Sequence, residues 1–307
     1  MDTAAALFFA LLTTASNALA TVLQRKAASR VPAADGLRWS LIARLARQRV
    51  WLAGIAAVPA AACFQALALG YGPLSVVQPV FVLELPAALL LAGVILSRRP
   101  PAGVWWAAAC ITAGLGIALW AAAPDAGHAT VPPGRWLLVL GCCLSAVAVL
   151  VAVAAVRAPG PVRASCLATS AAICYALTAA LLKTSVLRWE ASGAGGFFSA
   201  WQTYGFAAAG VAALFLLQNA LQSGSLVFSQ PALTLGDAGT SVALGVALYG
   251  ERIRGGWWAV AELAGAALVL TGLVLLSRSP LARELTGPAG QAAPLPGRCD
   301  GPGGQGR

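Results

Sequence analysis

The sequence contains very few charged residues. Only 10% of its 307 residues are Asp, Glu, Lys or Arg, against about 25% in an average soluble domain. A soluble fold of this length needs a charged, solvated surface, so this scarcity excludes a soluble globular protein. Hydrophobic residues make up 59% of the chain, and the mean hydropathy is +0.80, which excludes a disordered chain. What remains is an all-α bundle that crosses the membrane several times.

Side chains for metal binding or catalysis are also scarce. The one histidine, His128, falls in a predicted loop, so no serine–histidine pair is available for nucleophilic catalysis. Apart from Asp237, every aspartate lies outside the predicted spans, which leaves no partner for an aspartyl-protease pair. Six of the seven cysteines lie in apolar runs without a CxxC pair and are expected to be small apolar fillers. The composition predicts no enzyme activity and no cofactor.

The basic residues predict orientation. The net charge is +10, from 20 Lys and Arg against 10 Asp and Glu. No clustered basic, aromatic-interleaved face is present, so a nucleic-acid partner is not expected. Most basic residues fall in the segments on one side of the predicted spans, and basic loops stay in the cytoplasm. We therefore expect a multi-pass inner (plasma) membrane protein with its N-terminus outside and its C-terminus in the cytoplasm.

Spans of about 20 mainly apolar residues predict nine transmembrane helices. They cover residues 3–23, 51–70, 75–97, 103–123, 136–156, 165–187, 198–220, 225–249 and 256–277. The corresponding units are a first helix at 1–23, a basic cytoplasmic loop at 24–50, the rest of a first repeat at 51–123, loops with a connector span at 124–164, a second repeat at 165–277, and a disordered cytoplasmic tail at 278–307. Residues 36–50 have leucines on one face and arginines on the other, which predicts a helix on the inner leaflet. A very short span is the alternative for this segment.

An internal repeat appears when the chain is shifted by 152 residues. Residues 68–107 then match residues 220–259 at 14 of 40 positions without a gap. The informative matches are Gln78-Pro79 with Gln230-Pro231 and Trp105-Trp106 with Trp257-Trp258. Spans 1–4 thus resemble spans 6–9. Equivalent spans are five apart and cross in opposite directions, which is the inverted repeat typical of secondary transporters. Shared ancestry retained only for packing is the alternative.

Prolines at matching positions point to a substrate site. Pro79 and Pro86 in the third span and Pro231 in the eighth are predicted to interrupt their helices, because proline removes a backbone donor and frees a carbonyl. Such a carbonyl can face a cavity and bind a solute. A kink that serves packing alone is equally compatible with each proline taken singly. The neighbouring amides of Gln78 and Gln230 are included in the predicted site.

Two carboxylates are predicted at mid-membrane depth, Glu84 in the third span and Asp237 in the eighth. An acidic residue on a lipid-facing helix centre costs roughly 2.5–3.5 kcal/mol, so both should face the interior. One polar stripe along the eighth span contains Gln230, Thr234, Asp237 and Ser241. The exact repeat-mate of Asp237 is Leu85, so Glu84 is offset from the symmetric position.

The first span has a similar stripe, formed by Thr13, Asn17, Thr21 and Gln24, of which Asn17 is the predicted site residue. Hydrogen bonding between helices is the alternative for this stripe. Lys183 is expected to snorkel at the outer end of its span. Glu251 is expected to be a structural anchor of its loop.

The repeated pattern resembles the drug/metabolite transporter (DMT, EamA-like) superfamily. The second copy, SLVFSQPALTLGDAGTSVALGVALYGERI at 225–253, is similar to that family's paired signature, whereas Ser97-Arg98-Arg99 replaces the terminal Gly-Glu in the first copy. The nine spans, the basic loop and ASNALATVLQRKAA at 15–28 look most like the NIPA-type magnesium transporter branch. The resemblance covers about 275 residues and implies transport by alternating access.

For the NIPA-like branch, the implied substrate is Mg²⁺ or another divalent cation, with Glu84 and Asp237 as the metal ligands. Mg²⁺ prefers oxygen ligands and keeps several waters. The same side chains can bind an amine or relay protons for a small organic solute. A non-transporting scaffold and an intramembrane enzyme are the alternatives from other classes. The expected partners are membrane lipid and the substrate, and a homodimer stays open.

Overall fold

A computed structural model describes residues 2–28, 48–95, 101–125, 127–128, 130–223 and 226–279. Within these ranges the regular structure is helical, apart from one isolated β-bridge between Asp125 and Arg252. Nine helices of the described chain are long and apolar enough to cross a membrane by length and composition. The prediction of an all-α bundle with nine spans is confirmed. Helices suit this environment because hydrocarbon offers the backbone no other hydrogen-bond partners.

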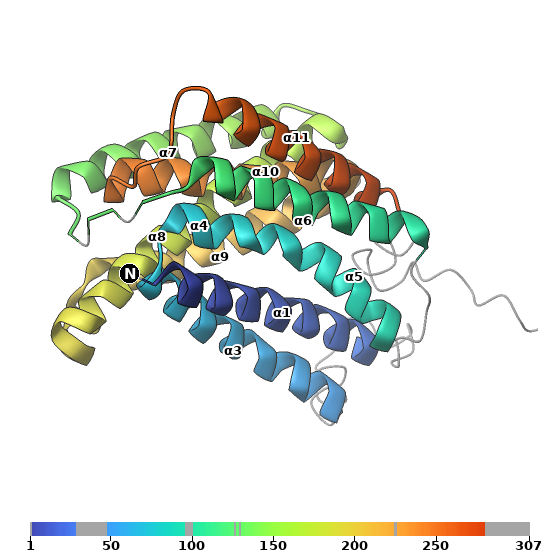
Figure 1. Cartoon of the computed structure of the whole chain (residues 1–307), viewed down its shortest axis with the longest axis horizontal. Helices are drawn as coiled ribbons and strands as arrows, with labels where there is room; N and C mark the ends of the chain where they lie inside the picture. The colour runs from blue at the N-terminus through green and yellow to red at the C-terminus, as the bar shows by residue number, and fades with distance from the viewer. Residues whose placement is uncertain are drawn as a thin grey trace, which may run out of the picture.

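The third span is a composite of short segments, and the span that ends at Ser199 has a kink at Gly193, whereas the other spans are single helices (Figure 1). In chain order the spans are α1 (Thr3–Ala28), α3 (Arg49–Tyr71), the composite of α4 (Leu74–Val80), the 3-10 turn η2 (Phe81–Leu83) and α5 (Glu84–Ile95), α6 (Ala102–Ala122), α7 (Pro133–Ala155), α8 (Pro161–Ser199), α9 (Trp201–Ser223), α10 (Leu226–Tyr249) and α11 (Trp258–Ser277).

Two helices extend well beyond the predicted spans. Helix α1 continues to Ala28 through a segment rich in Gln, Arg and Lys, which are good helix formers. Helix α8 continues from the predicted end at residue 187 to Ser199, with a kink at Gly193, whose φ is 62°. Hydropathy marks only the strongly apolar part of a helix. The ends of α1 and α8 contain charged and small residues and therefore fall outside the spans predicted for these two helices. The remainder of the predicted basic loop and the tail from residue 280 lie outside the described residues.

A few pairs of helices make most of the contacts in the bundle. The most extensive contacts join α1 with α3, α8 with α9 and α6 with α11, followed by α8 with α10. The N-terminus lies at one end of the bundle, together with the start of α4 (Figure 1). We call this end the N face. Successive spans alternate in direction, so α3 ends and α4 begins there, and α10 also ends there.

Glycines allow α6 and α11 to approach closely. A Cβ at Gly114 would lie 2.6 Å from the carbonyl oxygen of Gly265, and a Cβ at Gly265 would lie 2.6 Å from the carbonyl oxygen of Gly114. Farther along, Gly272 packs on Ala107 and Ile111. Residue numbers rise along one helix as they fall along the other, so the two helices are antiparallel. Small residues bring backbones together in this way inside membranes.

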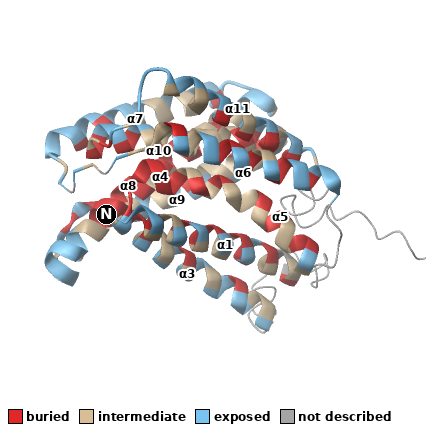
Figure 2. Ribbon diagram, viewed as in Figure 1, coloured by how far each residue is buried: buried red, intermediate tan, exposed pale blue. Residues whose placement is uncertain are grey.

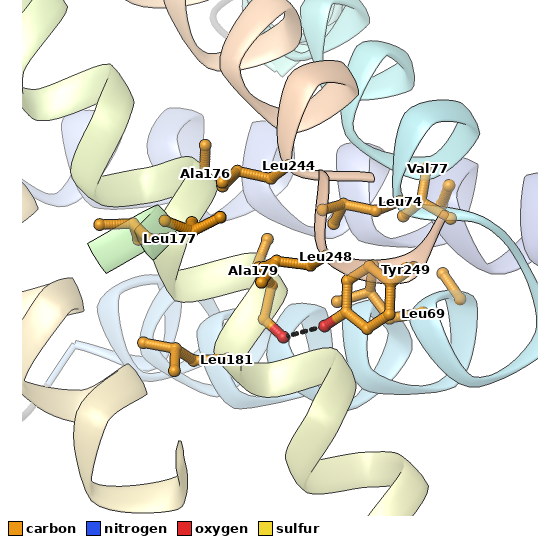
Figure 3. Packing of buried hydrophobic residues seen from close by; sticks show 14 of the residues in the cluster. Leu69, Leu74, Val77, Ala176, Leu177, Ala179, Leu181, Leu244, Leu248 and Tyr249 are labelled. Carbon is orange, nitrogen blue, oxygen red and sulfur yellow. Dashed lines mark hydrogen bonds between the residues drawn. The ribbon is translucent and has the colours of Figure 1, made fainter. Parts of the chain in front are cut away.

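The buried residues are concentrated in the middle of the bundle, where α4 is buried along most of its length (Figure 2). One apolar cluster near the N face joins α3, α4, α8 and α10, and includes Leu69, Leu74, Leu248 and Tyr249 (Figure 3). A second cluster joins α1, α5, α6 and α11. Outer helices expose apolar side chains instead, as Leu137 does on α7. Such surfaces fit contact with lipid rather than water.

Candidate functional site

The two predicted carboxylates lie at the middle of their spans. Glu84 is the first residue of α5, directly after the turn η2, and stands ten residues from Leu74. Asp237 lies in α10, twelve residues from Tyr249. At 1.5 Å per residue, each is roughly 15–18 Å from the N face. That depth is about half the thickness of a bilayer core.

Within the described part of the chain, each carboxylate accepts a hydrogen bond from one side-chain donor. The Asn17 Nδ2 on α1 donates to Glu84 Oε2 over 3.2 Å. The Ser241 Oγ donates to Asp237 Oδ1 over 3.4 Å, one turn along α10. The carboxylates of Glu84 and Asp237 also interact electrostatically with each other. Helices α1, α5 and α10 therefore bring three of the predicted site residues into one region.

Tyr175 on α8 belongs to the same region and was not predicted. Its phenol interacts electrostatically with both Glu84 and Asp237. Close packing explains how α8 reaches this position, because a Cβ at Gly236 would lie 2.9 Å from the Cβ of Ala172. Ala172 lies one turn before Tyr175 on α8. A phenol in the middle of an apolar span is the sequence feature that points to this residue. Tyr175, Glu84 and Asp237 are each partly accessible rather than fully buried.

The predicted amides and hydroxyls differ in their surroundings. Gln78 on α4 is 3% exposed, and its Nε2 has no hydrogen-bond partner among the described residues. Gln230 and Thr234 on α10 are partly buried. The buried donor of Gln78 is the more informative of these, since buried polar groups are almost always paired. No contact places Gln78 against either carboxylate, so its place in the site stays a prediction.

The polar stripe of α1 serves more than one purpose. Only Asn17 contacts a carboxylate, whereas the Thr13 hydroxyl donates to the Phe9 carbonyl of its own helix. The Gln24 Nε2 approaches the Gly54 carbonyl of α3 at 3.5 Å, in the manner of hydrogen bonding between helices. Thr21 is exposed.

The prolines have unequal effects on their helices. Pro79 lies in α4 two residues before the start of the 3-10 turn η2, so the third span is interrupted near it. Pro86 lies in the first turn of α5, where a missing backbone donor is tolerated. The predicted interruption at Pro231 is not seen, because α10 continues through it. Pro79 and Pro231 are each the sixth residue of their helix, so position relative to the helix start does not account for the difference.

The prediction that Lys183 snorkels is wrong. Lys183 is 2% exposed, and its Nζ lies 2.9 Å from Glu251 Oε1 in a buried ion pair. The Nζ also donates to the Gly72 carbonyl over 3.1 Å. Glu251 accepts from the backbone N–H groups of Leu74 and Ser75 at 2.7 and 3.0 Å, and from the Ser75 hydroxyl at 2.6 Å. Its partner is distant in sequence, so a rule based on position near a span end could not identify it.

The expectation that Glu251 anchors its loop is confirmed by these bonds, and its carboxylate occupies the N-terminus of α4, where anions are stabilised. Tyr249 and Gly245 complete the surroundings. Lys183 Nζ lies 4.6 Å from the centre of the Tyr249 ring, and the Tyr249 hydroxyl donates to the Ala180 carbonyl over 2.5 Å (Figure 3). A Cβ at Gly245 would overlap Glu251 Oε2, so this glycine makes room for the carboxylate.

Comparisons with known proteins name no function. No protein-family profile matches the chain, and no solved structure matches it. The chain is similar to an uncharacterized protein of Corynebacterium glutamicum, with 28% identity over 291 residues that cover 93% of this chain and 97% of that protein. The similarity thus extends over nearly the whole of both chains. The function has to be argued from the site.

Metal-binding side chains are not clustered in the described part of the chain. Within the described ranges, no group of three or more His, Cys, Asp or Glu side chains could hold a metal ion. His128 lines an open hollow of about 420 Å³ at the N face with Asp125, Gly127, Gly250 and Arg252, and neither Glu84 nor Asp237 lines it. The hydrogen bonds and electrostatic interactions described above define the candidate site, which consists of Glu84, Asp237, Asn17, Ser241 and Tyr175.

Proposed function

We propose that this chain is a secondary transporter that moves a small solute or cation through the membrane by alternating access. The observation behind the proposal is that Glu84 and Asp237, which interact electrostatically, both lie at mid-span depth. They come from the third and eighth spans, which are equivalent in the sequence repeat. Charged groups inside a membrane bundle are costly and typically mark a substrate or ion pathway.

The helix packing supports an inverted repeat as the basis of the mechanism. Helices α1 and α3 pack as extensively as their repeat equivalents α8 and α9. The fourth spans of the two copies, α6 and α11, pack on each other in antiparallel fashion. Two similar halves of opposite orientation can rock about a shared site and expose it to either side. Membership of the drug/metabolite transporter superfamily is proposed on the same grounds, together with the sequence signature.

A Mg²⁺ or other divalent-cation transporter of the NIPA type is the second candidate. Two carboxylates with neighbouring amide and hydroxyl oxygens suit Mg²⁺, which binds through one or two carboxylates and keeps several waters. The phenol of Tyr175 beside both carboxylates suits an amine equally well, because aromatic faces attract cations. We therefore propose transport of a small solute or cation and do not choose between Mg²⁺ and an amine.

Orientation and setting follow the charge distribution. We propose a location in the inner (plasma) membrane, with the N face outside and the C-terminus in the cytoplasm, on the basis of the basic loops. A homodimer is compatible with this arrangement. A non-transporting scaffold and an intramembrane enzyme remain the alternatives, and neither requires solute flux.

Reconstituted liposomes test the proposal. Purified protein is inserted into vesicles that contain a Mg²⁺-sensitive dye, or a pH-sensitive dye for amine exchange. Transport predicts flux of one probe above that of protein-free vesicles, and the probe that moves separates the two substrate classes. Absence of flux for Mg²⁺ and for a panel of amines and small metabolites would favour a scaffold.

A further inference from the structure

The buried ion pair between Lys183 and Glu251 joins the two halves of the bundle at the N face. Glu251 follows α10 in the second half, and its carboxylate accepts two backbone N–H bonds at the start of α4 in the first half. Lys183 on α8, also in the second half, donates to Gly72 between α3 and α4. The pair therefore attaches the Gly72–Ser75 segment of one half to the other half.

The segment that the pair attaches leads directly to the candidate site. Helix α4 has only seven residues and ends in the 3-10 turn η2, after which Glu84 begins α5. It packs against α1, α8 and α10. A 3-10 turn within a longer helix often marks a hinge, and η2 lies between α4 and α5. Glu84 and Asp237 lie roughly 15–18 Å deeper, behind this short helix.

The chemistry of the attachment suits a contact that opens and closes. A buried ion pair costs desolvation that apolar packing avoids, and it is therefore weak evidence for stability alone. Once water reaches it, both ions are hydrated and the cost of separating them falls. The same region also has apolar packing through Leu69, Leu74 and Leu248, which stabilises the fold near the N face in addition to the ion pair.

A different contact is described at the opposite end of the bundle. There, Lys26 at the end of α1 donates to the Ile95 carbonyl at the end of α5 over 3.0 Å, and both residues belong to the first half. The repeat-mate of Glu251 is Arg99, a residue of opposite charge outside the described ranges. A cation at that position cannot reproduce the carboxylate cap. The first copy of the repeat therefore has no sequence equivalent of the Glu251 carboxylate.

We propose that Lys183 and Glu251 form a latch that keeps α4 closed over the N-face route to Glu84 and Asp237, and that the latch separates when this face opens. This proposal rests on the proposed transport function in one respect, because transport is the reason for the N face to open. The latch itself is a structural claim about α4 that can be tested without a substrate.

Cysteine accessibility tests the latch. In a chain whose seven native cysteines are replaced, Val77→Cys places a thiol on α4 at a position that is fully buried. The protein is studied in lipid nanodiscs, where both faces meet a charged thiosulfonate reagent. We expect Lys183→Met combined with Glu251→Gln to raise the labelling rate of residue 77 by about tenfold or more. The reason is that removing the contact lowers the free energy of the open state relative to the closed state and so raises the open population. The double variant removes both charges and so leaves no unpaired buried ion.

Three controls make the outcome decisive. Arg188→Gln removes one exposed charge from the same helix and should leave labelling unchanged. Thr130→Cys, exposed at the N face, should label rapidly in every background. Ile111→Cys, buried between α6 and α11, should stay protected. Labelling of residue 77 at the rate of the unsubstituted background would overturn the latch. Equal gains at residues 77 and 111 would also overturn it, because they would show general loosening. If labelling follows the expected pattern but no solute flux is measured, the result would contradict the transport proposal and leave the latch supported.

Discussion

Glu84 and Asp237 are the residues whose position in the spans needs most explanation. Each would cost roughly 2.5–3.5 kcal/mol on a lipid-facing helix centre. Asn17 and Ser241 reduce that cost by donating a hydrogen bond to one carboxylate each. A carboxylate has about four lone-pair sites, so one donor each among the described residues leaves part of that accepting capacity unused.

Asn17 should matter for substrate binding more than for the fold. Asn17→Leu removes the donor to the Glu84 carboxylate, and a hydrogen bond to a charged group contributes about 1.5–3 kcal/mol. We therefore expect the concentration of solute at half-maximal flux to rise by about tenfold or more. Thr13→Val is the matched control on the same helix, because its hydroxyl bonds only within α1 among the bonds described. Equal effects of the two changes would contradict a role for Asn17 at the site.

Gly245 should be needed for the carboxylate cap on α4. Gly245→Ala places a Cβ where Glu251 Oε2 lies, and overpacking of this kind costs about 1–3 kcal/mol. We expect a lower melting temperature in detergent. Gly239→Ala on the same helix has no described neighbour within 4 Å and should be neutral or slightly stabilising, since alanine favours helix. Equal melting temperatures would show that Glu251 can move without loss.

The sequence was informative about some site residues for physical reasons. Glu84, Asp237 and Asn17 were predicted because polar groups inside apolar spans are rare and costly. Lys183 was misplaced and Tyr175 was missed, because both depend on partners that only the tertiary packing brings near. Gln78 was predicted from its repeat-mate, yet its surroundings show no described partner for Nε2.

At the scale of helices, hydropathy predicted the spans and left out their polar extensions. The spans from α3 to α7 begin and end within a few residues of the predicted limits. The extension of α8 to Ser199 and the 3-10 turn at Phe81–Leu83 were not predicted, since neither changes the apolar pattern. Proline position alone did not separate the interrupted third span from the continuous α10.

The α6–α11 contact should depend on its facing glycines. Gly114→Ala would place a Cβ 2.6 Å from the Gly265 carbonyl oxygen and 2.8 Å from the Val269 nitrogen, which are backbone atoms that cannot rotate away. We expect a loss of about 1–3 kcal/mol, measured as a lower melting temperature and reduced monodispersity in detergent. Gly116→Ala, with no described atom within 4 Å, should not lower either. A Gly114→Ala protein as stable as Gly116→Ala would contradict the close approach.

At the scale of the whole molecule, orientation is predicted by the basic loops. Reporter fusions at residues 40 and 300 should both give cytoplasmic signals, and a fusion at residue 125 should report the outside. The physical reason is that short segments rich in Lys and Arg are retained in the cytoplasm. Opposite signals from residues 40 and 300 would contradict the nine-span topology.

The central claim is that the two mid-span carboxylates bind the transported solute. The most direct measurement is liposome flux with Asp237→Asn, compared with Asp125→Asn, which removes the same charge from an exposed loop. Bonds to charged groups contribute about 1.5–3 kcal/mol, so Asp237→Asn should lower flux at limiting solute by about tenfold or more. Asp125→Asn should leave it unchanged. Flux through Asp237→Asn vesicles equal to that of the unsubstituted protein would contradict the account.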